Sequence, residues 1–178
     1  IEGVCASDRL VYLGSNTLFG VAREAALKTL EMTAGKVVTL AESSLGFRHG
    51  PKSIVNANTS VCLFVSAHPY TRQFDRDMLI ELVQDGTARH LIAVAPHAMV
   101  NELRALPHSA RLHIIALPES LHHYPYAVIA PLHVLVAQVM GLKLAVQHGV
   151  APDNPSPSGE VNRVVQGVTR YTFVPESN

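Results

Sequence analysis

Short, unbroken runs of hydrophobic residues recur along the chain, and stretches with helical spacing separate them. Runs of Val, Ile and Leu that do not alternate with polar residues are typical of strands buried on both faces, as in parallel sheets. Turn residues bound these runs, which supports their assignment as strands. We therefore predict five strands, at residues 9–14, 36–40, 61–65, 90–95 and 112–116.

Helices are predicted between these strands from apolar positions that repeat every three or four residues. Ser15 or Thr17 is expected to cap the first helix, which runs to about Ala34. Residues 41–51 are expected to form a loop rich in Ser, Gly and Pro. The remaining predicted helices are a short turn at 52–55, a helix at 71–85 ended by Gly86, a short helix at 100–106, and a long helix at 124–149 kinked or started at Pro131.

The alternation of strands and helices predicts an α/β fold, a three-layer α/β/α sandwich around a five-stranded parallel sheet. A chain of 178 residues suits one domain, which we place at residues 1–150. Residues 151–178 are expected to form a tail, because three prolines fall within its first seven residues. The chain starts at Ile1 without an initiating Met, so we expect it to be part of a longer protein.

Composition narrows the class of protein. Hydrophobic residues make up 48% of the chain and the mean hydropathy is +0.19, which excludes a disordered chain. Charged residues make up 16%, below the roughly 25% usual for soluble domains, which favours a surface that is partly covered. The formal net charge is zero, so no basic field is present to bind nucleic acid.

Two features bear on the compartment. Cys5 and Cys62 lie in apolar segments and are expected to be buried, reduced thiols, which favours the cytoplasm. Residues 126–146 approach the length of a membrane span, but this stretch contains proline, histidine, glutamine and lysine. We interpret it as a core or interface helix and expect no membrane contact.

Candidate chemistry falls in three places. Gly14–Thr17 is a glycine turn before a helix and could hold an anion, although a plain helix cap explains it equally well. Glu24, Lys28 and Glu31 share one helix face, either as a solvated charge ladder or as proton-transfer groups. Arg48 and His49 stand beside Gly-Pro, as an anion and acid/base site or as a structural turn.

Two other groups of polar residues are not expected to form functional sites. His122, His123 and His133 lack the spacing of a metal site, so no metal is expected. Acidic residues on the helix at 71–85 are expected to form its solvated face; these are Asp75, Asp77, Glu81 and Asp85.

Three segments together resemble a known family. RLVYLGSNTLFGVAREAALKTLEMT, ESSLGFRHGP and VCLFVS are similar to the sugar isomerase (SIS) domain, in particular to the catalytic second SIS domain of glucosamine-6-phosphate synthase. The segment PDNPSPSGEVNRVVQGVT resembles the subgroup of tagatose-6-phosphate ketose/aldose isomerases, also described as galactosamine-6-phosphate deaminase/isomerases. The specific part of the resemblance is the pattern E-x3-K-x2-E followed by HGP.

The resemblance implies a flavodoxin-like SIS fold and an enzyme that isomerises or deaminates an amino-sugar or ketose 6-phosphate through an enediol. By the family's pattern, Glu31 matches the enolising base and His49 the ring-opening acid/base. Glu24 and Lys28 match the supporting carboxylate and lysine. Such an isomerase needs no metal and no organic cofactor.

The resemblance also implies contacts with the substrate. They are expected at Gly14, Ser15, Asn16, Thr17, Ser43, Ser44, Arg48 and Arg163. At Arg163 the family has a lysine that handles the sugar carbonyl. Arginine stays protonated, so this departure puts an imine step at that position in doubt.

A second departure concerns the phosphate of the substrate. SIS domains that hold the sugar phosphate carry a loop of pattern SxSGxT, whereas residues 66–71 read SAHPYT. We therefore expect a preceding SIS domain in the parent chain to hold most of the phosphate, and this chain to supply the proton-transfer groups. In the family the ring-opening histidine can serve a neighbouring subunit, so a homodimer or higher homo-oligomer is expected.

Two other functions fit an SIS domain. One is a sugar-phosphate-binding module of a transcriptional regulator, which would require a basic helix-turn-helix segment upstream. The other is an inert dimerisation domain built on the apolar helix near residues 126–146. The presence of both Glu24 and Glu31 favours the enzyme, because a binding module does not need a base at that position.

Overall fold

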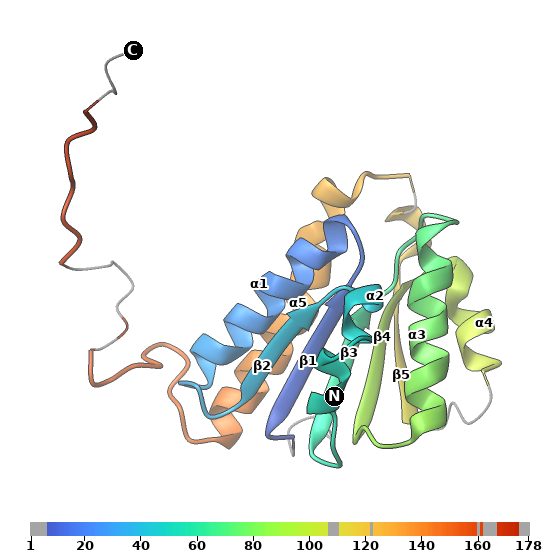
Figure 1. Cartoon of the computed structure of the whole chain (residues 1–178), viewed down its shortest axis with the longest axis horizontal. Coiled ribbons are helices and arrows are strands. Elements are labelled where there is room, and N and C mark those ends of the chain that lie inside the picture. The colour runs from blue at the N-terminus through green and yellow to red at the C-terminus, as the bar shows by residue number, and fades with distance from the viewer. Residues whose placement is uncertain (1–6, 107–110, 122, 160, 162–166, 175–178) are drawn as a thin grey trace.

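A computed structural model describes residues 7–106, 111–121, 123–159, 161 and 167–174. Five parallel strands form one sheet in the order β2-β1-β3-β4-β5, as the sequence predicts (Figure 1). The strands are β1 (Arg9–Gly14), β2 (Val38–Glu42), β3 (Thr59–Phe64), β4 (His90–Pro96) and β5 (Leu112–Leu117). Strand β2 begins two residues later than expected, because Ala34 and Gly35 have positive φ and turn the chain after the first helix.

The helices follow the predicted pattern in outline, with several differences. They are α1 (Thr17–Met32), α2 (Ser44–Phe47), η2 (Pro51–Ile54), α3 (Thr71–Asp85), η3 (His97–Met99), α4 (Val100–Arg104), η5 (Glu119–Leu121) and α5 (Tyr126–Gln147). The segment expected to be a loop contains α2. Helix α5 continues through Pro131 and does not start there. The expected cap of α1 is wrong: its N-cap is Asn16, and no side chain caps the helix.

Two helical layers cover the sheet, so each strand alternates its side chains between two cores. Leu10 and Tyr12 of β1 face the core shared with α1 and α5, and Val11 and Leu13 face the core shared with α3 and α4. Figure 1 shows α1 and α5 together on one side and α3 and α4 on the other. This burial on both faces explains why the strands read as unbroken hydrophobic runs.

After α5 the chain leaves the sandwich. The described residues between 151 and 174 contain no helix or strand, and in Figure 1 they extend away from the layers. Several of their apolar side chains are exposed; these are Val161, Val168, Tyr171, Phe173 and Val174.

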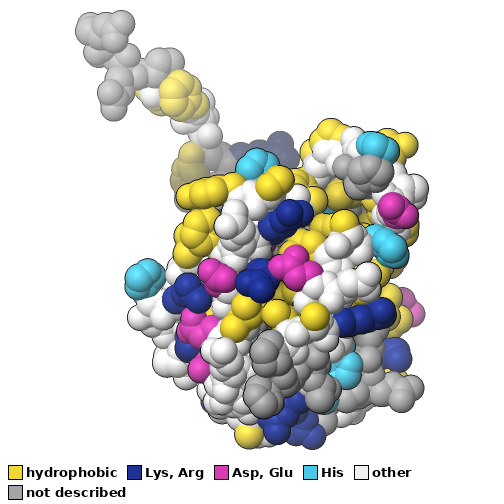
Figure 2. Space-filling view, turned by 90° about the vertical axis from the view of Figure 1, so that its right-hand side faces the viewer, with side chains coloured by type: hydrophobic (Ala, Val, Ile, Leu, Met, Phe, Trp, Pro, Cys, Tyr) yellow, Lys and Arg dark blue, Asp and Glu magenta, His cyan; other side chains and the backbone are white. Residues whose placement is uncertain are grey.

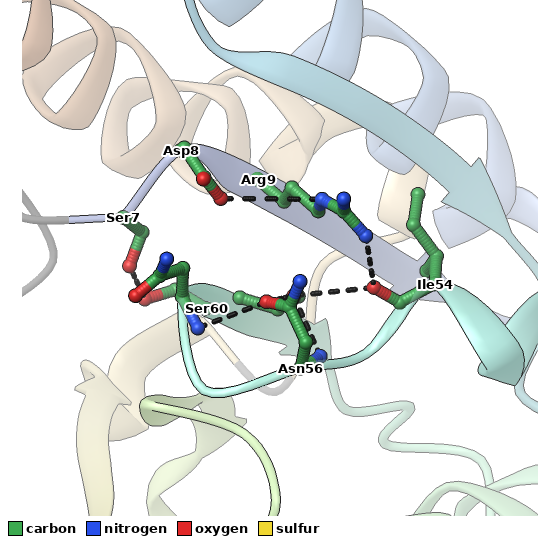
Figure 3. A network of polar contacts seen from close by, with 8 residues as sticks. Ser7, Asp8, Arg9, Ile54, Asn56 and Ser60 are labelled. Carbon is green, nitrogen blue, oxygen red and sulfur yellow. Dashed lines mark hydrogen bonds and ion pairs between the residues drawn. The ribbon is translucent and has the colours of Figure 1, made fainter.

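Polar contacts at the amino-terminal edge of the sheet hold the segment that follows α2 (Figure 3). Arg9 donates a hydrogen bond of 3.1 Å to the carbonyl oxygen of Ile54, the last residue of η2. Asn56 closes the next turn, where its side chain accepts from the Thr59 hydroxyl at 2.9 Å. The chain from α2 to β3 is thereby fixed along the face of the sheet that α3 covers, because Phe47 and Ile54 pack in that core.

Gly14 lies where β1 meets the first turn of α1, and no larger residue fits there. A Cβ atom at this position would lie 2.3 Å from the carbonyl oxygen of Leu18, which is backbone and cannot move aside. Gly20, within α1, has open space around the same position. The two glycines therefore differ in how they tolerate a methyl group.

We expect Gly14→Ala to lower the free energy of unfolding by about 1–3 kcal/mol, because the methyl group overpacks the strand–helix junction. In contrast, Gly20→Ala should raise it by about 0.5–1 kcal/mol, since alanine is the better helix former. Urea unfolding of the two variants measures both effects. Equal stability of Gly14→Ala and the unmodified protein would contradict the close approach.

Candidate functional site

A buried carboxylate joins three segments at the carboxyl-terminal edge of the sheet. Asp75, in the first turns of α3, accepts hydrogen bonds from the hydroxyls of Ser15 at 2.6 Å and Ser44 at 2.5 Å. Its other oxygen accepts from the backbone N–H of Ser66 at 2.9 Å. Asp75 is fully buried, so the expectation that it belongs to the solvated face of its helix is wrong.

The position of Asp75 in the sequence indicates burial, although its charge suggests a solvated side chain. Asp75 precedes Met78, Leu79 and Leu82 at intervals of three, four and seven residues, which places it on their face of the helix. Those three side chains are buried. The charge of Asp75 predicts a solvated position, whereas its spacing places it in the core.

The predicted turn Gly14–Thr17 is held against α3 by a second contact. The Asn16 side chain donates a hydrogen bond of 3.2 Å to the hydroxyl of Thr71, the first residue of α3. Asn16 has φ of 52° and ψ of −123°, a conformation that costs a non-glycine residue about 1–3 kcal/mol. Thr17 is exposed in the first turn of α1. The structure thus brings the Ser15 hydroxyl within 3.3 Å of the Ser44 hydroxyl, while Asn16 makes a separate hydrogen bond to Thr71.

Ser43 begins α2 and does not reach Asp75. Its hydroxyl accepts from the backbone N–H of Gly46 at 3.0 Å, which caps the short helix. The carboxylate of Glu42 in turn accepts from the backbone N–H of Ser43 at 2.7 Å.

Arg48 is already bound to a carboxylate. Its guanidinium lies 2.8 Å from Glu81 of α3. Lys52 contacts the same Glu81, and lies 2.8 Å from Asp85. The hydrogen bonds to Asp85 and Glu81 raise the pKa of Lys52 above its usual value. These ion pairs attach the segment after α2 to α3.

Further charges on α3 are also paired. Arg76 lies 2.6 Å from Glu102 of α4 and 3.9 Å from Asp77. Figure 2 views the molecule from the side on which α4 lies in Figure 1, and basic and acidic side chains are intermixed at its centre. This face presents ion pairs and no field of one sign.

His49 follows α2 and is exposed. Its backbone N–H bonds to the carbonyl of Gly46, but its ring has no hydrogen-bond or ion-pair partner within the part of the chain that the structure describes. The imidazole is therefore available to a group outside these residues.

Glu24, Lys28 and Glu31 come together on α1 as their spacing predicts. The Lys28 ammonium lies 2.8 Å from Glu31 and 3.8 Å from Glu24. The hydrogen bond to Glu31 raises the pKa of Lys28 above its usual value. The three side chains are 33–43% exposed, so this group, which we name the α1 triad, lies on the surface of the layer.

The α1 triad and His49 do not meet within one chain. Helix α1 packs in the core on one face of the sheet, whereas Phe47, two residues before His49, is buried in the core on the opposite face. The sheet therefore separates the two predicted catalytic elements. Arg163, the remaining predicted site residue, lies outside the described residues.

Helix α5 lies beside the α1 triad. Gly141 of α5 is so close to α1 that an added Cβ would lie 3.1 Å from the Met32 sulfur and 3.7 Å from the Thr29 Cα. The outer face of α5 carries exposed apolar residues with successive spacings of 4, 3, 4, 3 and 4. These residues, which we name the α5 stripe, are Val128, Leu132, Leu135, Val139, Leu142 and Val146.

A stripe of this kind is the seam by which helices pack against other helices. Helix α5 is also long and apolar enough to cross a membrane by length and composition alone. However, it packs on the sheet through Ile129, Ala137 and Leu144. The inner face of α5 thus belongs to the core, and its outer face is an exposed apolar surface.

A cavity of about 430 Å³ lies at the carboxyl-terminal ends of β3, β4 and β5, and it is lined by none of the predicted site residues that the structure describes. Its walls are mainly apolar, so no motif in the sequence indicates the cavity. The polar groups on its wall include His68, His97, Glu119, Tyr126 and His133. The Tyr126 hydroxyl contacts the Ser66 hydroxyl at 3.1 Å and the backbone N–H of Ala67.

Comparison with known proteins relates this arrangement to sugar-phosphate enzymes. No protein-family model matches the sequence. The D-galactosamine-6-phosphate deaminase AgaS of Escherichia coli O157:H7 is 49% identical over 168 residues, which is 94% of this chain. The AgaS of Shewanella sp. is 42% identical over 94% of the chain. The chain is a homologue of the AgaS deaminases. It spans about two fifths of their length, 42% and 39% respectively.

Solved structures agree with the homology to AgaS. The tagatose-6-phosphate ketose/aldose isomerase of Escherichia coli has a TM-score of 0.74 and 42% identity, over 87% of this chain and 40% of that one. The carboxyl-terminal domain of glucosamine-fructose-6-phosphate aminotransferase from Francisella tularensis has a TM-score of 0.67 at 18% identity, over 83% of this chain and 38% of that one. The second match concerns the fold alone. The SIS-type α/β fold predicted from the sequence is confirmed.

Among the described residues of this AgaS homologue, no group of three His, Cys, Asp or Glu side chains is placed to hold a metal ion.

His133, on the cavity wall, is fully buried in α5. Its Nδ1 lies 3.2 Å from the carbonyl oxygen of Ile129, and its Nε2 has no partner among the described residues. Burial lowers the pKa of His133, because the charged form is desolvated.

We expect stability to fall with pH below about 6.5, because the unfolded chain then binds a proton at His133 that the folded chain does not. The loss should reach up to about 1.4 kcal/mol per pH unit until the pKa of the folded state is reached. His133→Phe fills a similar space without titrating, so its unfolding free energy should depend less steeply on pH. Urea unfolding from pH 7.5 to 5 measures both slopes. Equal slopes would contradict the buried neutral state.

Proposed function

We propose that the chain is the carboxyl-terminal SIS half of an aldose–ketose isomerase or deaminating isomerase. Its substrate is an amino-sugar or ketose 6-phosphate, such as galactosamine 6-phosphate or tagatose 6-phosphate. The observation that carries the proposal is the α1 triad, in which one ammonium lies between two carboxylates. Identity of 49% to an AgaS deaminase supports the choice of substrate.

The chemistry suits these residue types. With an aldose or amino-aldose, Glu31 takes the proton from C2 of the open-chain sugar and returns it to C1; with a ketose, it moves a proton from C1 to C2. A carboxylate can do both because it acts first as base and then as acid. Lys28 stabilises the negative charge that develops on the sugar oxygens in the enediol. Glu24 holds Lys28 in place, and His49 opens the sugar ring by proton transfer. When C2 carries an amine, the resulting imine adds water and releases ammonia.

The α1 triad requires a cover to do this chemistry. Its carboxylates are exposed to water, which weakens charge interactions and competes for the hydroxyls of a sugar. The α5 stripe beside it is an apolar surface that fits another helical layer. Because the chain spans about two fifths of its AgaS relatives, we propose that a preceding SIS domain of the parent protein packs on the α5 stripe and covers the triad.

The same domain is proposed to hold most of the substrate's phosphate. In the loop between β3 and α3 the polar groups are engaged within the protein: Ser66 bonds to Tyr126, and Thr71 accepts from Asn16. His68 accepts from the backbone N–H of Tyr70 at 3.3 Å. Arg48 is paired with Glu81. These contacts leave few local groups to bind a phosphate dianion.

His49 is proposed to act on the triad of a second copy, in a homodimer or larger homo-oligomer. The sheet lies between His49 and the triad of its own chain, and the exposed ring has no partner among the described residues.

The proposed domain comprises residues 1–150, with residues 151–178 as a tail. A cytoplasmic location is supported by Cys62, a buried free thiol.

We expect Glu31→Gln in the parent protein to lower kcat on galactosamine 6-phosphate and tagatose 6-phosphate by about 10²–10⁴-fold, because the amide cannot take a proton. The melting temperature should stay close to that of the unmodified protein, since the side chain is exposed. Glu102→Gln, on the opposite face of the sheet, is the matched control and should keep full activity. Undiminished turnover by Glu31→Gln would remove Glu31 from the mechanism. A parent protein inactive on both sugars would overturn the proposed function.

Sharing of the site between copies is tested by mixing two inactive parent variants, Glu31→Gln and His49→Asn. In a dimer that exchanges subunits, hybrids contain one intact site, so the mixture should regain about a quarter of the unmodified activity. Each variant alone is the control. If the mixture stays inactive after subunit exchange has been verified by mass spectrometry, the two residues act within one chain.

A further inference from the structure

The cavity at the carboxyl-terminal ends of β3, β4 and β5 has no part in the proposed chemistry. Its volume of about 430 Å³ falls within the range of small-molecule sites, which is about 300–1,000 Å³. Voids in protein interiors are seldom larger than a water molecule, so a hollow of this size is not a packing defect. It lies at the edge of the sheet where parallel α/β folds bind their ligands.

The charges on the cavity wall are unsuited to the substrate proposed above. Among the described residues that line it there is no lysine or arginine, and Glu119 contributes a carboxylate. A phosphate dianion would lose its hydration there without a cation to balance it, and Glu119 would repel it. The α1 triad does not line the cavity either. The cavity therefore differs in charge and in place from a site for a sugar phosphate.

The inner wall of the cavity is apolar. Val65, Leu117 and Ile129 line it and are buried. The Tyr126 hydroxyl, also on the wall, is already engaged by the Ser66 hydroxyl and the backbone N–H of Ala67. Water against such a wall finds few partners, so an apolar group that displaces it gains free energy. The ligand that fits this wall has a mainly apolar body.

His133 contributes the buried polar atom of the wall that lacks a partner. Its Nδ1 lies 3.2 Å from the carbonyl oxygen of Ile129, which can only accept, so Nδ1 carries the proton. Burial lowers the pKa of His133 and keeps the ring neutral, which leaves Nε2 with an unshared lone pair. Nε2 has no partner among the described residues. An unsatisfied buried acceptor is costly, and a ligand that donates a hydrogen bond to Nε2 removes that cost.

We propose that this cavity binds an uncharged small molecule with a mainly apolar body and one hydroxyl or N–H group that donates to Nε2 of His133. A charged ligand is excluded because the apolar wall would not replace its hydration. The site is separate from that of the sugar phosphate, and the proposal does not rest on the function proposed above. Phenol has both required features and serves as the probe, and benzene has the same ring without the donor.

Titration of the full parent protein with phenol, followed by saturation-transfer NMR, measures the binding. A ligand of this size in an apolar site should bind with a Kd of about 1 mM. Ile129→Trp fills the cavity and should raise the Kd by about tenfold or more. The matched control is Leu45→Trp, at an exposed leucine of α2 on the α3 side of the sheet, and it should leave the Kd unchanged. Unchanged phenol binding by Ile129→Trp would overturn the proposal.

A second blocking variant covers the case in which Ile129→Trp does not fold, which its melting curve would show. Ala98 lies in η3 on the exposed side of the cavity, so Ala98→Trp narrows the entrance without disturbing the core. We expect this variant to melt like the unmodified protein and to bind phenol at least about fivefold more weakly. Phenol binding at the unmodified Kd in folded Ala98→Trp would contradict the site.

Benzene separates the hydrogen bond from the apolar contact. In His133→Phe, the Kd of phenol should rise about tenfold because one hydrogen bond is lost, whereas the Kd of benzene should change less than about twofold. Equal changes for the two probes would refute the role of Nε2. Galactosamine 6-phosphate in excess should not displace phenol from the unmodified parent protein, and displacement would show that the cavity is not a separate site.

Discussion

All five strands of the sheet run in the same direction, and this constraint sets where every other group lies. Each connection must return from the carboxyl end of one strand to the amino end of the next. Each helix therefore begins near the carboxyl ends of the strands and ends near their amino ends. Helix α1 therefore begins beside Ser15 and carries Glu31 away from it, into its last turn. The parallel order thus divides the predicted site residues between an edge cluster around Asp75 and a surface group on α1.

The two faces of the sheet hold different charge arrangements. On the α3 face, Arg48 and Lys52 are bound to Glu81 and Asp85, which fixes the segment carrying His49. On the α1 face, Lys28 has carboxylates on both sides and lies next to an apolar helix. The first arrangement orders a loop, and the second leaves its charges accessible from outside. Within one chain, the sheet separates the two arrangements.

Much of the fold could be predicted because hydrophobic periodicity decides which segments face a core. The strands and the helix Thr71–Asp85 are examples, and the face shared by Glu24, Lys28 and Glu31 follows from spacing alone. What could not be predicted depends on contacts distant in sequence. Ser15 was expected to cap a helix, but its hydroxyl bonds to a residue 60 positions away. The apolar cavity beside Tyr126 has no local pattern, because its wall is assembled from three strand ends and the start of α5.

The exposure of the α1 triad also has an electrostatic consequence. Two unit charges 4 Å apart interact by about 1 kcal/mol in bulk water and by about 4 kcal/mol at the effective dielectric constant near a protein surface. The Lys28 ammonium lies 2.8 Å from Glu31 and 3.8 Å from Glu24. These half-exposed groups lie at the boundary between bulk water and the protein surface. Covering the triad would strengthen its field severalfold without moving an atom of α1. The same three side chains would thus interact weakly when the triad is exposed to water. When another domain covers them, they would act strongly on the charges of a bound molecule.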